Sequence, residues 1–339
     1  MARVGINPAR GQVSSYRPAR VTVVMITYIP DLSGYFEQRL QVLQLVIASL
    51  QQHTKLPHDV MVFDNGSCSQ VVDYLQDLHQ AGQIDYLLLS QQNIGKIGAF
   101  RIAFSAAPGE IVAYNDDDVF FYPDWLEAHL DVLESFSTAG LVSGLPVRDA
   151  ARHAHRSLDE LVAQGAPGIS ITRQRRIPDE WEADWAVSTG RDPQAHLQAT
   201  QDHLDLVLEI ANSNGSGSVE AIGSANHFQF VAYKRVLLQA LPVQWSGKLM
   251  GQMVEFDEAV DSLGYLRLST TQRYTRHIGN LLSPAILQEA QDLDLQTPSS
   301  PGFAQRHGAA AKKHWLLRIP GARHILVATY KRLFDVLYR

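Results

Sequence analysis

The sequence predicts an α/β fold, in which helices flank a sheet and a helical appendage follows at the C-terminal end. Two observations predict it. Short runs rich in β-branched residues alternate with longer segments whose apolar residues recur at three- and four-residue steps. After residue 280 only the helical spacing continues. Strands and amphipathic helices that alternate along a chain bury their apolar faces against each other in layers, which is the α/β arrangement.

Four strands and three helices are expected in the first third of the chain. The strands are residues 21–26, 60–63, 84–89 and 111–114. The helices between them are residues 36–53, 69–80 and 96–106, the first with one apolar stripe. Because a crossover helix follows each of the first three strands, the four strands are expected to be parallel with right-handed connections.

The rest of the chain divides by composition. Residues 148–218 are rich in Gln, Asp, His, Gly and Ser, and Trp181 and Trp185 within them are spaced as on one face of a helix. Apolar runs return at 228–233, before a short helix, and at 254–268. The expected domain plan is an N-terminal arm at 1–20, one domain at 21–280 with an insertion at 148–218, and a helical segment at 281–339 with a break at 297–302.

Composition limits the classes of function. With 339 residues, 45% of them hydrophobic, the chain can bury a large core. The net charge of −6 gives no field that would attract DNA or RNA, so nucleic acid is not an expected partner. Cys68 is the single cysteine, which excludes an intrachain disulfide and favours the reducing cytoplasm. Residues 1–20 lack the apolar core of a signal peptide, and no apolar run reaches the ~18 residues of a membrane span.

Three consecutive carboxylates, Asp116, Asp117 and Asp118, follow the fourth expected strand. Adjacent carboxylates repel each other unless a divalent cation lies among them, and Mg2+ or Mn2+ binds carboxylate and phosphate oxygens together. Alternate residues of an extended chain point the same way, so the paired ligands are either Asn115 and Asp117 or Asp116 and Asp118. A solvated acidic turn is the alternative interpretation of this string alone.

Several strings resemble, in chain order, the family 2 glycosyltransferases of GT-A fold. Residues 23–28 and 62–67 are similar to the family's first two strands, and residues 92–101 to its Asn-x-Gly stretch before the third helix. Pro123 follows the acidic cluster, as a proline that starts a helix does in the family. The resemblance implies a GT-A, Rossmann-like mixed sheet flanked by helices, a nucleoside-diphosphate sugar as donor, and Mn2+ or Mg2+ as cofactor.

The resemblance also implies which residues bind the donor. Tyr28 would stack on the base, and Asp64 would accept a hydrogen bond from the N3–H of uracil or the donor edge of guanine, so UDP is favoured and GDP stays open. Glycines and a helix N-terminus suit the diphosphate. A plain turn at 64–67 and a packing role for the glycines are the alternatives. The full expected set is Thr27, Tyr28, Asp64, Asn93, Gly95, Lys96, Arg101 and Asp116.

Catalytic residues are expected late in the domain. Residues 255–265 resemble the acidic pair at the start of the family's acceptor-side helix, and one of that pair is the general base in inverting members. The base must lie within hydrogen-bond reach of the acceptor hydroxyl, and Glu258 is preferred to Asp257. Acids that simply favour the positive end of a helix are the alternative. His277 lies where the family has a further metal or diphosphate ligand, so the expected metal set is Asp116, Asp117, Asp118 and His277.

The sequence departs from the family after the acidic pair. The Arg that many members carry there is absent from residues 261–264, so diphosphate contacts are expected from Lys248, Arg273 or Arg276. Residues 223–228 resemble the loop that touches donor sugar and acceptor in related enzymes. His227 within this loop either takes part in the site or simply ends a strand.

The predicted function is metal-dependent, inverting transfer of a sugar, of hexosyltransferase type, to a hydroxyl of a glycan, lipid-linked or small-molecule acceptor. The rivals are a sugar nucleotidyltransferase, which would need a Gly-rich basic loop after the first strand, and a sugar-nucleotide-binding protein without turnover. Residues 312–339 mix basic and aromatic side chains, which suits peripheral contact with an anionic membrane. The alternatives for this segment are packing on the domain itself or on another subunit of a homo-oligomer.

Overall fold

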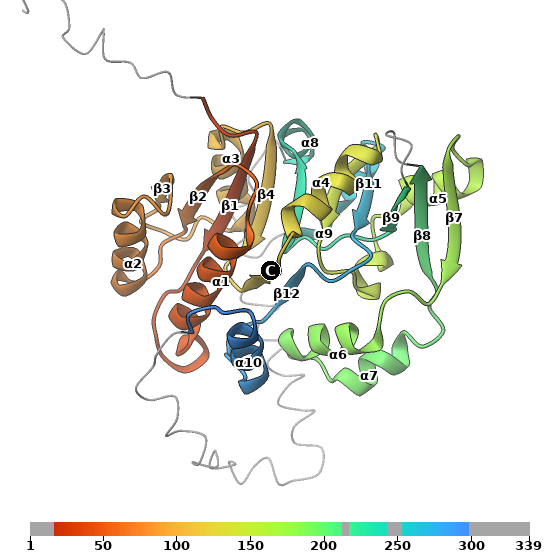
Figure 1. The fold of residues 1–339 in the computed structure, drawn as a ribbon. Helices are drawn as coiled ribbons and strands as arrows, with labels where there is room; N and C mark the ends of the chain where they lie inside the picture. Colours follow the sequence, from red (N-terminus) through yellow and green to blue (C-terminus); the bar gives the residue numbers. More distant parts are fainter. Residues whose placement is uncertain (1–16, 212–216, 243–252, 298–339) are drawn as a thin grey trace, which may run out of the picture.

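A computed structural model describes residues 17–211, 217–242 and 253–297. Within these ranges the main sheet is mixed and runs, in Figure 1, from β3 on the left to β7 on the right. Its strands, in spatial order, are β3 (Tyr86–Leu89), β2 (His58–Asp64), β1 (Val21–Thr27), β4 (Ile111–Asp116), β10 (Gln229–Tyr233), β6 (Ala139–Ser143), β11 (Leu266–Ser269), β9 (Ser218–Ile222), β8 (Asp205–Ala211) and β7 (Ile169–Gln174). The predicted α/β fold with a mixed sheet flanked by helices is confirmed.

The first half of the sheet is the parallel unit that the sequence predicts. β1 pairs in parallel with β2 and with β4, and β2 pairs in parallel with β3. The connecting helices are α1 (Arg39–His53), α2 (Ser69–Gln80) and α3 (Lys96–Ala106). The first begins three residues later than predicted, after a short 3-10 turn, η2 (Gly34–Phe36). The carboxyl ends of β1, β2 and β4 therefore meet at one edge of the sheet.

The sheet changes direction next to β4. There β10 pairs antiparallel with both β4 and β6, whereas β11 is parallel to β6. Helix α4 (Trp125–Ser135) leads into β6, and α8 (Lys234–Ala240) and α9 (Met253–Ser262) follow β10 in the chain. A separate antiparallel pair, β5 (Val119–Phe121) with β12 (Thr275–His277), places His277 opposite Val119. β12 thus returns the chain to Asp116, Asp117 and Asp118 at the end of β4, called the acidic loop below.

Residues 148–218, expected to be an insertion, mostly extend the same sheet. They form η3 (Arg148–Arg152), α5 (Arg156–Gln164), β7, α6 (Asp179–Ser188), α7 (Pro193–Ala199) and β8. β7, β8 and β9 are joined antiparallel to one another, and β9 pairs antiparallel with β11. Trp181 and Trp185 lie on α6, as their spacing predicts, and Trp185 is buried.

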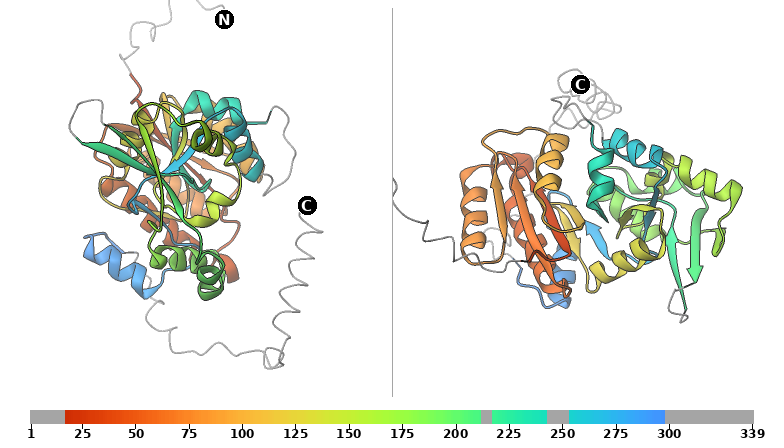
Figure 2. Two further views of the ribbon diagram at one scale, coloured as in Figure 1. Left: turned by 90° about the vertical axis from the view of Figure 1, so that its right-hand side faces the viewer. Right: turned by 90° about the horizontal axis from the view of Figure 1, so that it is seen from above.

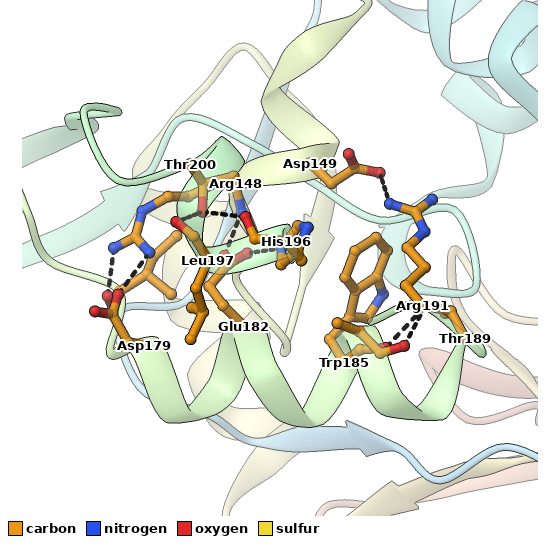
Figure 3. A network of polar contacts seen from close by, with 12 residues as sticks. Arg148, Asp149, Asp179, Glu182, Trp185, Thr189, Arg191, His196, Leu197 and Thr200 are labelled. Atoms are coloured by element: carbon orange, nitrogen blue, oxygen red, sulfur yellow. Dashed lines mark hydrogen bonds and ion pairs between the residues drawn. The ribbon is translucent and has the colours of Figure 1, made fainter. Parts of the chain in front are cut away.

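A polar network fixes α6 and α7 below the sheet (Figure 3). The buried guanidinium of Arg148 contacts Asp205 of β8 through Nε at 3.0 Å, and its backbone N–H donates to Glu182 of α6 at 2.6 Å. Glu182 also bonds Nε2 of His196 on α7 at 2.5 Å. Because a buried charge without a partner is costly, these pairs hold α6 in one position. The C-terminal half of α6 is thereby carried beneath the edge where β1 and β4 end.

Two cores lie on opposite faces of the sheet, because successive residues of a strand point to opposite sides. Val23 and Met25 of β1 belong to the core covered by α1, α2 and α4, whereas Val24 and Ile26 belong to the core covered by α3, α8 and α9. Figure 2 shows helices on both sides of the sheet.

The helical appendage begins with α10 (Pro284–Asp292), which packs Ile286 and Ala290 on the first core. Ser283 caps this helix by accepting from the N–H of Ile286, and Pro284 occupies its first turn. No helix among the described ranges is long and apolar enough to cross a membrane. Residues 1–16, Lys248 and residues 312–339, with the expected membrane contact, lie outside those ranges.

Candidate functional site

The acidic loop after β4 is held by Arg39 of α1. Asp117 is buried and accepts hydrogen bonds from the hydroxyl of Thr27, at the end of β1, and from Arg39 Nη2. Arg39, also buried, donates through Nη1 to Asp118 Oδ2 at 3.2 Å and to the carbonyl oxygen of Gly279 at 3.2 Å. The guanidinium thus joins the loop after β4 to the chain that follows β12.

Asp116 is paired on the other side of the loop. It accepts a hydrogen bond from Lys96 Nζ at 2.7 Å and another from the hydroxyl of Tyr114. Lys96 is the first residue of α3, and its ammonium lies 5.5 Å from the centre of the Tyr114 ring. In addition to the divalent ion that the sequence predicts among the three carboxylates, Arg39 and Lys96 supply two positive charges from the chain itself.

The protonation equilibria of the loop differ from one carboxyl to the next. Burial raises the pKa of Asp117, even though Arg39 favours its ionised form. Burial would also raise the pKa of Asp118, but His277, Arg39 and Lys96 together lower it below its usual value. Of these two buried carboxylates, Asp118 is therefore the one whose ionised form, the form that binds a cation, is favoured more strongly by its surroundings.

Asp118 and His277 offer two ligand atoms to a metal ion. His277 Nε2 lies 3.5 Å from Asp118 Oδ1, and this oxygen is buried without a hydrogen-bond partner in the part of the chain that the structure describes. The other ring nitrogen of His277 bonds the hydroxyl of Ser188 on α6 at 2.8 Å. A carboxylate oxygen and an imidazole nitrogen fit Mn2+, so the residues present suit the expected cofactor.

The structure favours one of the two registers that the sequence leaves open. Asn115 is buried, with its amide on the carbonyl oxygen of Asp116, and Asp117 is directed at Arg39. The side chains of Asp116 and Asp118 are 24% and 14% exposed, against 9% for Asp117, so they are the more exposed acids of the loop.

Asp118 and His277 line a cavity of about 660 Å3. Its other walls come from the end of α6 and from the chain between β12 and α10, which lie close together below the sheet in Figure 1. Lining side chains include Tyr35, Asp184, Ser188, Arg276 and Leu281. The cavity is large enough for a small ligand, and ligand sites of open α/β sheets occur at this carboxyl edge.

The turn after β2 is tied to the start of α3. Buried Asp64 accepts from the backbone N–H groups of Gly66 and Ser67 at 3.2 Å. The amide of Asn65 donates to Asn93 Oδ1 at 3.0 Å, and the N–H of Gly95 donates to the same oxygen at 2.8 Å. The structure thus brings Asp64, Asn93 and Gly95 to neighbouring loops, where the expected base contact of Asp64 stays a prediction.

Two other expected donor-binding residues lie differently. Tyr28 follows β1 with 38% of its surface exposed, so its ring is open to a ligand. Arg101 does not join Lys96, because five residues along a helix rotate a side chain by about 140°. It lines a second groove, between α3 and α8, with Leu238, Leu241 and Pro242.

The expected catalytic pair is divided between the two sides of α9. Glu258 is exposed, whereas Asp257 is fully buried. Asp257 Oδ2 accepts from His153 Nε2 at 2.8 Å and from His227 Nδ1 at 3.0 Å, and lies 3.1 Å from Arg267 Nη2. Burial alone would raise the pKa of Asp257, but hydrogen bonds from the two histidines and the charge of Arg267 lower it to about 2.

The Asp257 cluster and the acidic loop lie at the same edge of the sheet. The residue after His227, Phe228, accepts a hydrogen bond from the N–H of Asp116 at 2.8 Å through its carbonyl oxygen. Its ring centre is 5.1 Å from that of His277. Phe228, the residue next to His227, therefore contacts both Asp116 and His277 of the expected metal site.

Part of the chain matches a known protein family. Residues 32–185, from the turn before α1 to within α6, match the model of glycosyl transferase family 2. Residues 32–185 therefore carry a family 2 glycosyltransferase domain, and the match covers less than half of the chain. This confirms the resemblance found in the sequence.

Relatives of this glycosyltransferase domain cover only parts of the chain. An uncharacterized glycosyltransferase of Nostoc sp. is 27% identical over 123 residues, which is 36% of this chain and 37% of that protein. A mannosyltransferase from Pyrobaculum calidifontis, solved with GDP-Man and Mn2+, is 24% identical over 38% of this chain and 36% of its own, with a TM-score of 0.31. GalNAc-T7, solved with UDP, GalNAc and Mn2+, is 11% identical over 80% and 47%, with a TM-score of 0.45. The chain thus spans less than half the length of each.

The arginines expected to bind the diphosphate, Arg273 and Arg276, are already paired. Arg273 donates to Asp184 of α6 at 2.8 Å, and Arg276 contacts Asp184 at 3.0 Å and also pairs with Glu289 of α10. Arg276 therefore links α6 and α10 to β12 and also lines the cavity, whereas Arg273, two residues before β12, is bonded to α6.

Three candidate functional residues were missed from the sequence: Arg39, His153 and Arg267. Arg39 precedes the apolar stripe of α1, and a cation directly before such a stripe was the one available signal. His153 and Arg267 lie in segments of ordinary composition. Only the fold brings them within reach of Asp257.

Proposed function

We propose that the protein is a metal-dependent glycosyltransferase that moves a sugar from a nucleoside-diphosphate donor to an acceptor hydroxyl. The observation that carries this proposal is the pairing of Asp118 Oδ1 with His277 Nε2 on a cavity of about 660 Å3 within a family 2 domain. UDP-sugars are the favoured donors and GDP-sugars the next. Residues of the described chain would hold Mn2+ or Mg2+ through Asp118 and His277, with Asp116 beside them.

Each remaining residue has a role that its position supports. Tyr28, beside Thr27, offers an open ring to the nucleotide base, and the turn at Asp64 lies two strands from the acidic loop. Gly95 and Lys96 open α3, where backbone N–H groups and the ammonium suit phosphate oxygens. The divalent ion, when bound, neutralises charge on the diphosphate leaving group.

On the acceptor side we place the proton acceptor at the Asp257 cluster rather than at exposed Glu258. The sugar would be transferred with inversion to a glycan, lipid-linked or small-molecule hydroxyl, and the reaction would take place in the cytoplasm. Attack from the Asp257 side on a donor held at the acidic loop is supported by the hydrogen bond between Asp116 and Phe228.

Metal removal tests the proposal. We expect UDP or GDP to raise the melting temperature only when Mn2+ is present, and EDTA to abolish that increase, because the ion bridges protein and diphosphate. D118N and H277A should lose the Mn2+-dependent part of the increase. The matched control is D124N, since Asp124 is an exposed acid that contacts Lys55.

Nucleotide release separates turnover from binding. The wild-type protein should release nucleoside diphosphate from a sugar nucleotide in the presence of Mn2+. Stabilisation by nucleotide without any release would identify the sugar-nucleotide-binding protein instead. Equal stabilisation of wild type and D118N in EDTA would contradict a metal at this loop.

A further inference from the structure

The carboxylate of Asp257 lies behind two imidazoles. Asp257 is 0% exposed, whereas the side chains of His153 and His227, which both donate to it, are 25% and 34% exposed. A general base must come within hydrogen-bond reach of the hydroxyl that it deprotonates. An acceptor that enters from solvent therefore meets an imidazole and not the carboxylate.

Arg267 holds this cluster together. Besides its contact with Asp257, its guanidinium donates to the carbonyl oxygens of His153 at 2.8 Å and of Ala225. One side chain of β11 thus fixes the two loops that carry His153 and His227. The ligand atoms of Asp257, His153 and His227 also have the spacing of a metal site. The guanidinium 3.1 Å from the shared carboxylate oxygen already balances its charge, however, and would repel a second cation.

The two histidines bond Asp257 through different ring nitrogens. His153 bonds Asp257 through Nε2, so its remaining nitrogen is Nδ1, the one nearer its own backbone. His227 bonds Asp257 through Nδ1, which leaves the outer nitrogen, Nε2, to carry the lone pair. A carboxylate on Nδ1–H with Nε2 as proton acceptor is the arrangement by which an imidazole serves as a general base in hydrolases.

We propose that His227 Nε2 is the general base of the glycosyl transfer and that Asp257 is the residue that positions it. This inference rests on the proposed function. The acceptor oxygen forms its bond to the anomeric carbon as its proton passes to Nε2. The bond from the anomeric carbon to the diphosphate oxygen breaks, and its electron pair leaves with the nucleoside diphosphate. The imidazolium, stabilised by Asp257, then releases the proton to solvent.

The charged groups around His227 define the expected pH dependence. They are Asp257 of α9, which His227 contacts directly, and Arg267 of β11 and His153 in the loop after η3, which contact the same carboxylate oxygen. An imidazole accepts a proton only in its neutral form, so the rate should begin to fall at a higher pH than it would with a carboxylate base. A carboxylate base would keep the rate constant down to about pH 4.

The test is nucleoside-diphosphate release from a sugar nucleotide with Mn2+, measured across pH for matched variants. H227N keeps a donor at the position of Nδ1 but has no Nε2, so its kcat should fall about 10²–10⁴-fold with little change in KM, and the acidic limb of the profile should vanish. D257N should also lower kcat, because the imidazole loses its orientation. The control is H155Q, since His155 is an exposed histidine that contacts Asp159 outside the site.

The outcomes are distinguishable. The proposal is supported if H227N loses turnover but keeps the Mn2+-dependent thermal stabilisation by nucleotide. It is overturned if H227N turns over like H155Q, or if E258Q rather than H227N removes the acidic limb. If the wild-type protein releases no nucleoside diphosphate from any sugar nucleotide, the proposed function fails and the role of His227 fails with it.

Discussion

At the scale of residues, the buried guanidinium of Arg39 contacts two of the three neighbouring aspartates. Asp117 is the deeper of these two carboxylates, with a side chain only 9% exposed. Exchanging a buried ion pair for apolar groups is often neutral, but removing one partner leaves an uncompensated charge in the protein interior. Arg39 therefore stabilises the protein mainly because it compensates the buried charge of Asp117.

The variant R39Q should lower the free energy of unfolding by about 3–5 kcal/mol, because it leaves Asp117 buried without its counter-charge. Urea denaturation measures this change. In the R39Q background, D117N should restore part of the loss. K55Q breaks an ion pair whose side chains are 64% and 60% exposed, and it is the control with little expected effect. Similar losses in R39Q and K55Q would contradict a buried charge pair.

His129 predicts a pH dependence of stability. Burial lowers the pKa of this histidine to about 4, although hydrogen bonds to Trp125 and Gln229 act in the opposite direction. As pH falls below about 6.5, the unfolded chain takes up the proton before the folded one does. The free energy of unfolding should therefore decrease, by on the order of 3 kcal/mol between pH 7 and pH 4. Denaturation at stepped pH measures it, and H129Q should remove most of this slope; an unchanged slope would assign it to other groups.

At the scale of elements, the site depends on how the turn after β2 meets the loop before α3. Gly66 has a φ of +90°, and a Cβ there would lie 2.9 Å from the backbone carbon of Gln92. The hydrogen bonds of Asn65 with Asn93 and with the N–H of Ile94 require this close approach. The turn after β2 and the loop before α3 thus pack together only because Gly66 has no side chain.

The variant G66A should therefore destabilise the protein by more than the cost of its backbone conformation. G82A is the matched control, because Gly82 has a φ of +72° but open space where a Cβ would lie. It should cost only the left-handed conformation, about 1–2 kcal/mol. Thermal and urea unfolding of the two variants compare them, and equal losses would show that the contact with Gln92 is unimportant.

How far the sequence predicts the structure depends on the range of the interactions. The strands and helices before residue 116 follow from local apolar periodicity, and 69–80 and 96–106 are predicted to the residue. The acidic loop is equally visible, because its residues are consecutive. Arg39 and His153 are not, since their partners Asp117 and Asp257 lie 78 and 104 positions away in the chain. Arg267 lies near Asp257 in the sequence, but its bond to the carbonyl oxygen of His153 spans 114 positions. The sequence pattern also could not decide between Glu258 and Asp257 as the base. Their different burial depends on which side of α9 packs against the rest of the fold.

At the scale of the whole molecule, the core on the α1 side extends across the sheet without interruption. It includes Val71 of α2 at one end and Leu208 of β8 at the other. Both Trp125 of α4 and Trp185 of α6 belong to it. The half that carries the acidic loop and the half that carries β7 to β9 therefore share one set of buried contacts.

Unfolding should accordingly be a single cooperative transition across the described chain. Far-UV circular dichroism follows all elements, and tryptophan fluorescence reports on both halves through Trp125 and Trp185. The two signals should give the same midpoint in urea. Separate midpoints would show that the β7–β9 half unfolds independently of the rest.

The charge balance of the acidic loop bears on how the protein can be handled. Because Arg39 and Lys96 form ion pairs with neighbouring aspartates, the loop should keep its shape in a chelating buffer. Purification in such a buffer should therefore give folded, metal-free protein. Mn2+, Mg2+ and other divalent ions can then be added one at a time.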